Sequence, residues 1–160
     1  MNESADISSV YSLIIFFILV SFFISLFLFF RGSNKRKISY FVSGLIISSL
    51  NTIVEALSYK YNLYEIKGPW KILATPFPMF ILWIFLSFIY IDLYFRFKNK
   101  FPTFLYLILG VVLGWCFDFV GWKIGLLEIK ENGSPFINAS VWIVLVPLSL
   151  AIPKLILKGK

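Results

Sequence analysis

Two acidic residues lie inside apolar segments of this sequence. Glu55 follows Asn51 by one helical turn, and Asp118 lies in a second apolar segment. Ionisable residues inside a membrane segment usually face the interior of a helix bundle and mark a functional site. Two carboxyl groups in an aromatic-rich cleft could act as an acid/base pair on a lipid or isoprenoid. Glu55 and Asp118 are therefore candidate catalytic residues, and Asn51 is a candidate orienting residue.

The same acids have a plainer interpretation. Each lies near the end of its apolar segment, so both could be solvated at the outer interface of a membrane. Lys60 and Lys123 each follow an acid by five residues and could serve as interfacial counter-charges. The sequence leaves both interpretations open.

The composition excludes several other kinds of site. The chain has no histidine, which rules out a Ser-His-Asp triad and a histidine metal site. Its single cysteine, Cys116, rules out an internal disulfide and a thiolate zinc cluster. The glycine-rich phosphate motifs are missing from the sequence. We therefore expect neither a metal nor a cofactor.

The elements that must position the acids are long apolar segments. Of 160 residues, 59% are hydrophobic and only 14% are charged, too few to cover a soluble surface. A run of about 20 apolar residues can cross a bilayer as a helix. Such runs lie at 10–30, 40–57, 76–94, 102–122 and 135–155. The sequence thus predicts an all-α membrane protein with five transmembrane helices in a single membrane domain, 1–160.

The basic residues predict an orientation. Most of them lie in clusters at 31–37, 96–100 and 154–160, on one side of the predicted membrane. Because positively charged loops stay in the cytoplasm, we expect a multi-pass protein of the cell membrane with its amino terminus outside and its carboxyl terminus inside. The net charge is +7, but the basic residues lie between apolar runs rather than on one soluble face. We therefore do not expect nucleic-acid binding.

An internal repeat relates the two acids. The segment 55–67 matches 118–130 without a gap, so that Glu55 aligns with Asp118. A recurring unit of this kind indicates duplication. We predict an anchor helix at 10–30 followed by two parallel hairpin repeats at 38–97 and 101–157, which place the acids at similar depths.

Two short sequence patterns that follow each acid recur as well. Thr75-Pro76 and Ser134-Pro135 each predict a helix start, with the hydroxyl residue as N-cap. The Leu-x-Glu-Ile-Lys segments that end at Lys67 and Lys130 are either solvated interfacial anchors or an amphipathic lid that carries Trp70.

Small residues share a face with each acid. Gly44, Ser48, Asn51 and Glu55 recur at helical spacing, as do Gly110, Gly114 and Asp118. Small residues let helices approach closely, so each acid should face a partner helix. Gly110 and Gly114 form a GxxxG motif, which also predicts a homo-oligomer through these two residues.

The order of these features resembles known membrane families. An acid near the end of a span is followed by a Leu-x-Glu segment, a proline and a span that contains Trp83 or Trp142. This order is similar to that in small prokaryotic multi-pass families without known function. It is more distantly similar to the small integral-membrane carotenoid and terpenoid cyclases, although their Pro-x-x-Glu signature is missing. That resemblance implies that Glu55 and Asp118 protonate a lipidic substrate without a redox cofactor.

Three kinds of function remain open at this stage. The chain could act on or bind a lipid or isoprenoid through its intramembrane carboxylates. It could be a small proton-coupled transporter or a channel subunit, because matched acids in parallel repeats suit a central pathway. It could also be a non-catalytic component of a membrane assembly.

Overall fold

Five long helices make up most of the protein. The computed structural model describes residues 7–31 and 34–158; residues 1–6, 32–33 and 159–160, which the predicted domain includes, lie outside this part. The helices are α1 (Ile7–Phe30), α2 (Asn34–Lys60), α3 (Phe77–Phe97), α4 (Thr103–Lys123) and α5 (Pro135–Lys158). Each is long and apolar enough to cross a membrane. The prediction of a helical protein with five potential spans is confirmed. The boundaries move by at most three residues, except that α2 begins six residues earlier than predicted.

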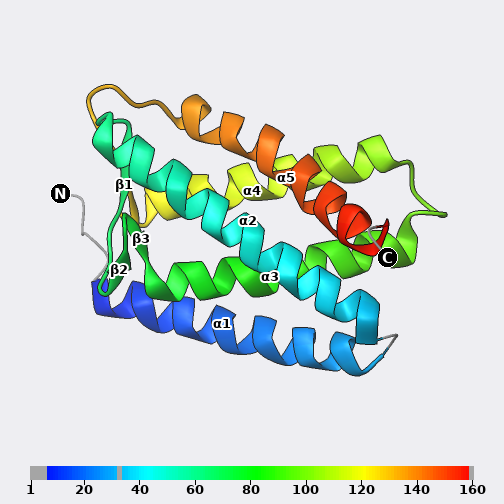
Figure 1. Ribbon diagram of the computed structural model, residues 1–160. Helices are drawn as coiled ribbons and strands as arrows, with labels where there is room; N and C mark the ends of the chain where they lie inside the picture. The colour runs from blue at the N-terminus through cyan, green and yellow to red at the C-terminus, as the bar shows by residue number, and fades with distance from the viewer. Residues whose placement is uncertain (1–6, 32–33, 159–160) are drawn as a thin grey trace.

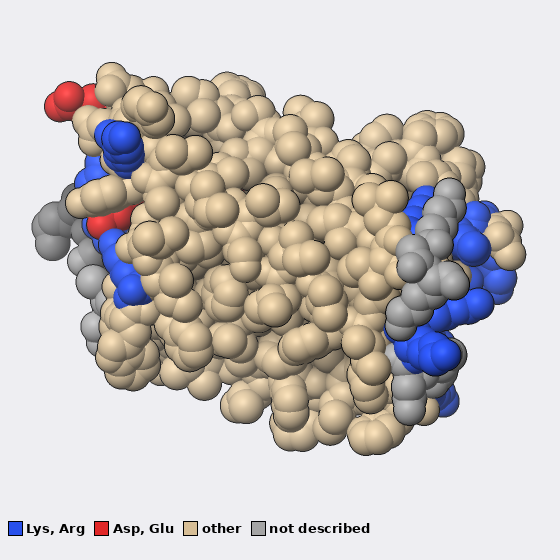
Figure 2. Space-filling model, in the orientation of Figure 1, with Lys and Arg blue, Asp and Glu red and all other residues tan. Residues whose placement is uncertain are grey.

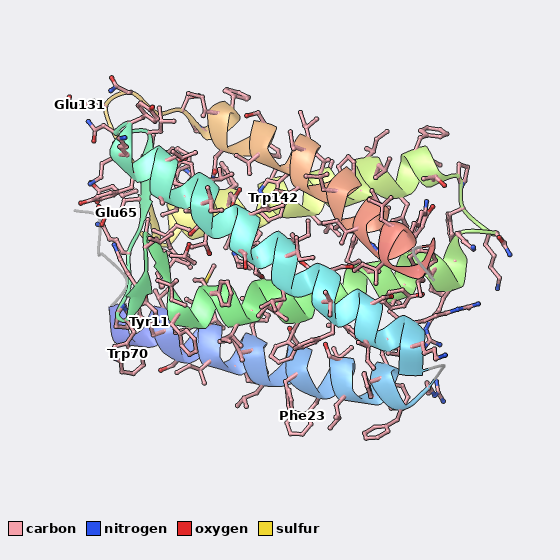
Figure 3. All side chains as sticks on the ribbon, viewed as in Figure 1. Tyr11, Phe23, Glu65, Trp70, Glu131 and Trp142 are labelled. Atoms are coloured by element: carbon pink, nitrogen blue, oxygen red, sulfur yellow. The ribbon has the colours of Figure 1, made fainter. Side chains whose placement is uncertain are left out.

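The surface divides into an apolar band and two charged ends. Figure 2 shows a wide band without charged side chains, with Lys and Arg gathered at both ends and acidic side chains visible at one of them. Helix α1 presents large apolar side chains to the outside; Phe23 points away from the bundle in Figure 3 and is 63% exposed. Helix α1 begins at the end that carries the strands, and α5 ends at the opposite end (Figure 1).

Helix α2 packs closely on α3 through its small residues. A side chain at Gly44 would place its Cβ 2.8 Å from the backbone oxygen of Ile84, so the helices approach closely at this point. The hydroxyl of Ser48 donates a hydrogen bond to the backbone oxygen of Phe80 at 3.3 Å. Because Asn51 and Glu55 lie further along the same face, this packing turns them into the bundle as predicted.

Short strands, which the sequence analysis treated as loops, join the helices at one end. Strand β1 (Tyr64–Ile66) pairs antiparallel with β4 (Leu127–Ile129), and Glu65 lies opposite Glu128. We call this pair the ribbon. Strands β2 (Lys71–Ile72) and β3 (Thr75–Pro76) form a second antiparallel pair. Three-residue strands give little local signal, because they form only where distant segments meet.

The spacing of the helices is uneven. Helix α2 packs along both α3 and α5, and α4 packs along α5. Helices α3 and α4 are instead bridged by large side chains. The Trp83 and Phe117 rings lie 4.8 Å apart, and the hydroxyls of Tyr90 and Tyr106 each donate a hydrogen bond to the other residue's backbone oxygen. This separation leaves space between α3 and α4.

A buried ion cluster joins α2 and α3 at the end opposite the ribbon. Asp92 pairs with Arg96, one helical turn further along α3, at an N–O distance of 2.5 Å. Asp92 also pairs with Lys37 of α2, a contact that sequence reasoning missed. Both Asp92 and Lys37 are buried, so each depends on the other for compensation of its charge.

Candidate functional site

Glu55 is buried in α2 and is held by two donors. Its side chain is buried, with the residue 4% exposed. The amide nitrogen of Asn51 donates to Glu55 Oε1 at 2.5 Å, one helical turn away. The Thr75 hydroxyl donates to the other carboxyl oxygen, Oε2. Both oxygens of Glu55 are therefore held by hydrogen bonds, and the orienting role of Asn51 stays a prediction.

Thr75 differs from the prediction made for it. The sequence predicted an N-cap at Thr75, but Pro76 takes the N-cap position of α3 and Thr75 belongs to strand β3. The reason is that the fully buried Thr75 hydroxyl binds Glu55 rather than the helix end. In the other half of the chain, Ser134 does cap α5, because its hydroxyl accepts a hydrogen bond from the Ile137 backbone nitrogen at 3.3 Å.

Asp118 lies in α4 and has a different partner. Its side chain is half-buried, and the Trp142 indole nitrogen donates to Asp118 Oδ2. Trp142 comes from α5, so this bond ties the two helices together. The Asp118 carboxyl group is therefore bonded through one of its oxygens to an aromatic side chain of the neighbouring helix.

The structure brings the two acids to one small cavity. Glu55 and Asp118 both line a space of about 10 Å³, which we call the acid cavity. Asn51 and Asn138 also line it, and Asn138 is buried. A cavity of roughly this volume has room for about one water molecule.

The ribbon covers the acid cavity. Tyr64, Ile66 and Leu127 point inward from β1 and β4 and line the cavity, and all three are buried. Burial raises the pKa of the Tyr64 hydroxyl, which stays protonated at neutral pH. Glu65 and Glu128 lie on the outer side of the same strands. The ribbon is thus amphipathic, with an apolar side toward the acids and a charged side toward solvent.

Lysines neutralise the outer side of the ribbon. Lys130 pairs with Glu128 at 2.9 Å and with Glu65 at 3.3 Å, and so bridges two like charges that face each other. Lys71 adds a contact to Glu65 at 2.7 Å. The hydrogen bond from Lys71 lowers the pKa of Glu65, and the hydrogen bond from Lys130 lowers that of Glu128. Figure 3 shows Glu65 at this end of the molecule and Trp70, 78% exposed, beside the start of α1.

The proposed counter-charges lie elsewhere. Among the residues that the structure describes, neither Lys60 nor Lys123 forms an ion pair with Glu55 or Asp118. Lys123 lies 4.6 Å from the centre of the Trp122 ring, and Lys60 lies near the Tyr61 ring. The carboxyl group of Glu55 instead accepts hydrogen bonds from Asn51 and Thr75.

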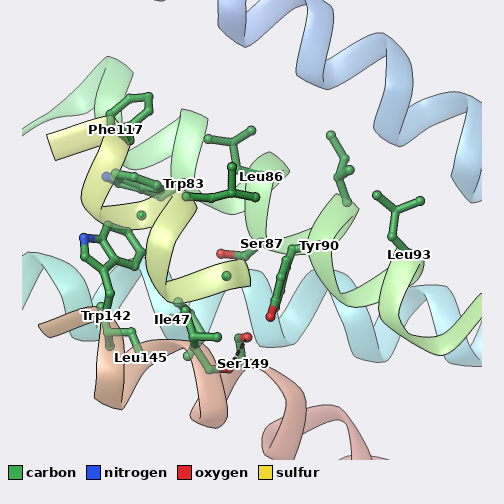
Figure 4. Close-up of a pocket in the computed structure, with 15 residues that line it drawn as sticks. Ile47, Trp83, Leu86, Ser87, Tyr90, Leu93, Phe117, Trp142, Leu145 and Ser149 are labelled. Carbon is green, nitrogen blue, oxygen red and sulfur yellow. Dashed lines mark hydrogen bonds between the residues drawn. The ribbon is translucent and has the colours of Figure 1, made fainter. Parts of the chain in front are cut away.

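A second, larger cavity lies next to the acid cavity. It has a volume of about 370 Å³, and its walls are almost entirely apolar side chains of α2, α3, α4 and α5. We call it the apolar cavity. Trp83 and Trp142, with ring centres 4.8 Å apart, line both cavities and form the partition between them. In Figure 4 the two tryptophans stand at one end of the apolar cavity and Leu93 lies at the other.

The GxxxG glycines shape the apolar cavity. Gly110 and Gly114 are buried and line the cavity. A side chain at Gly110 would meet the Tyr90 ring, and one at Gly114 would meet the Trp142 ring. Both glycines are therefore packed inside the chain's own bundle, and an oligomer through them stays a prediction.

Sequence reasoning missed several residues of the site. Thr75 and Ser134 carry the same local signal, so the bond from Thr75 to Glu55 could not be distinguished from a cap. Trp83 and Trp142 were noted only as corresponding positions of the predicted repeat, and Asn138 carried no signal. Among the described residues, no group of three or more His, Cys, Asp or Glu side chains could hold a metal ion.

Comparisons with protein-family models, with curated proteins and with solved structures give no match for this chain.

Proposed function

We propose that this chain is a five-span membrane protein that binds an isoprenoid or another long apolar molecule between α3 and α4 and acts on it through Glu55 and Asp118. The single observation that carries this proposal is the shared wall of the two cavities. An apolar space large enough for a small molecule ends at two tryptophans, and two carboxyl groups line the space behind them.

The apolar cavity supports access from the bilayer. Leu113 lines this cavity and is 56% exposed, so the cavity reaches the apolar outer surface of the bundle. A molecule dissolved in the hydrocarbon core of a membrane could enter there without crossing water. Ser87, Tyr90 and Ser149 carry the hydroxyl groups on the walls. The hydroxyls of Tyr90 and Ser149 donate to backbone oxygens, so the cavity stays suited to a hydrocarbon chain.

The two carboxyl groups suit acid/base chemistry. A carboxyl group that carries a proton can deliver it to a double bond or an epoxide, and a carboxylate can receive a proton from the product. Such a reaction needs neither a metal nor a nucleotide. In this proposal Glu55 and Asp118 exchange protons with the substrate, and Asn51 holds Glu55 in position.

The ribbon supports the proposed duplication. Glu65 lies opposite Glu128, its counterpart in the repeat. The bond from the Lys67 nitrogen to the Leu126 oxygen has its counterpart in that from the Lys130 nitrogen to the Leu63 oxygen. A twofold axis between the glutamates relates these bonds. With the amino terminus outside and the carboxyl terminus in the cytoplasm, the ribbon lies on the outer surface of the cell membrane.

The other functions stay predictions. A proton-coupled transporter or channel subunit would need a polar path, whereas the walls of the apolar cavity favour a hydrocarbon. A non-catalytic assembly component would need neither cavity. Proteoliposomes prepared with an internal pH dye test the first of these, because a transporter would change the internal pH when a gradient is applied.

Filling the apolar cavity tests the proposal. Ser87→Phe places a ring in the centre of the cavity, and Ser49→Phe places the same ring on the exposed face of α2. We expect purified Ser87→Phe to lose isoprenoid binding by at least about tenfold, and Ser49→Phe to bind as the natural protein does. Equal binding by both variants, measured with a tritiated isoprenoid in detergent micelles, would remove the proposal.

A further inference from the structure

The two tryptophans of the partition differ in one respect. The Trp142 indole nitrogen donates to Asp118. The Trp83 indole nitrogen is fully buried and has no hydrogen-bond partner among the residues that the structure describes. A buried donor without an acceptor costs stability, so such a group is rare and calls for a specific explanation.

The position of Trp83 identifies where an acceptor would lie. Trp83 lines the acid cavity together with Glu55 and Asp118, and the residue is 8% exposed. In Figure 4 the indole nitrogens of Trp83 and Trp142 lie on the side of their rings that faces away from Tyr90 and the rest of the apolar cavity. The free donor therefore lies where the apolar cavity meets the acid cavity.

We infer that the Trp83 indole nitrogen donates a hydrogen bond to a single neutral oxygen at the end of the bound apolar molecule. The oxygen belongs to a hydroxyl, epoxide or carbonyl group, because each of these accepts a hydrogen bond. This inference rests on the proposed function and names the substrate class: a long hydrocarbon with one oxygen at its inner end.

The surrounding groups fit one oxygen and little more. The acid cavity, at about 10 Å³, has room for about one oxygen atom with its hydrogens. The Asn51 and Thr75 donors are already engaged with Glu55, and the Trp142 donor with Asp118. The Trp83 nitrogen is thus a fully buried donor without a protein partner among the described residues, and it can select an oxygen while the apolar cavity selects the chain.

A pair of matched ligands tests this inference. Geranylgeraniol and the hydrocarbon of the same skeleton without the hydroxyl differ only in the oxygen. We expect the natural protein in detergent micelles to bind the alcohol roughly five- to tenfold more tightly, as one added hydrogen bond predicts. Trp83→Phe, which removes the nitrogen and keeps a ring, should reduce this preference to less than about twofold.

Controls keep the two proposals distinguishable. Trp122→Phe changes a surface tryptophan in the same way and should keep the preference. If Trp83→Phe fails to fold, benzothienylalanine at position 83 keeps the shape of the indole and replaces the nitrogen with sulfur. Equal binding of the alcohol and the hydrocarbon by the natural protein would overturn the inference, as would a preference that survives the loss of the nitrogen. Failure of both ligands to bind would instead overturn the proposed function.

Discussion

The half of the bundle that carries Glu55 is more tightly fixed than the half that carries Asp118. In the first half, α2 and α3 pack closely at Gly44, Glu55 has two donors, and Lys37 and Asp92 form a buried pair at the far end. In the second half, a tryptophan holds Asp118 and α4 stands away from α3. The two halves of the bundle therefore differ: the first is closely packed, and the second leaves space between α4 and α3.

The buried pair is the strongest element of the tighter half. Asp92→Ala leaves Lys37 charged and buried without its partner, which typically costs about 3–5 kcal/mol of stability. The double variant Lys37→Met, Asp92→Leu should recover most of that loss, because no unpaired charge remains. Thermal unfolding in detergent micelles measures both. A loss below about 1 kcal/mol in Asp92→Ala would show that this pair does not fix the first half.

The two hydroxyl residues before α3 and α5 offer a matched test. Thr75→Val removes a buried donor from Glu55 and should cost roughly 1–3 kcal/mol. Ser134→Ala removes a helix cap and should cost about 1 kcal/mol. Equal losses in thermal unfolding experiments would mean that Thr75 acts only as a cap, as its sequence context suggests.

The two tryptophans should respond differently to the same change. Trp142→Phe breaks a hydrogen bond to Asp118, whereas Trp83→Phe removes a donor that has no partner among the described residues. Both lose similar ring contacts, so we expect Trp142→Phe to be less stable by roughly 1 kcal/mol. Unfolding in the absence of added lipid measures this difference, and the reverse order would contradict the assignment of the free donor to Trp83.

Acid should loosen the ribbon. The pKa values of Glu65 and Glu128 are lowered in the folded protein by their lysine partners. Their stabilisation is therefore complete above the unfolded glutamate pKa of about 4.3 and is lost as the pH falls through the folded values. Amide hydrogen exchange in β1 and β4, corrected for intrinsic rates, should rise over that range. The variant with Glu65→Gln and Glu128→Gln should lack this pH dependence.

The sequence predicted the helices well and the partners of the site residues poorly. Apolar runs of about 20 residues specify helices locally, so the five predicted spans agree with α1 to α5. The burial of Glu55 beside Asn51 also followed from helical spacing. The acid/base roles of Glu55 and Asp118 stay predictions, because the structure gives their positions and not their chemistry.

The features that the sequence did not predict depend on contacts between distant segments. Strands β1 and β4 are three residues long and exist only because the two hairpins meet. Thr75 and Ser134 have the same neighbours in sequence but different partners in space. The apolar cavity arises from the separation of α3 and α4, which the sequence of neither helix specifies alone.

Photo-crosslinking with an isoprenoid alcohol that carries a diazirine next to its hydroxyl tests the central claim most directly. The probe is bound to the purified protein, irradiated, and its adducts are located by mass spectrometry. We expect adducts on Asp118, Trp83 and Trp142, where the apolar cavity meets the acids. Adducts confined to the outward side chains of α1, such as Phe16 and Phe23, would contradict the claim, because those side chains are exposed and line neither cavity.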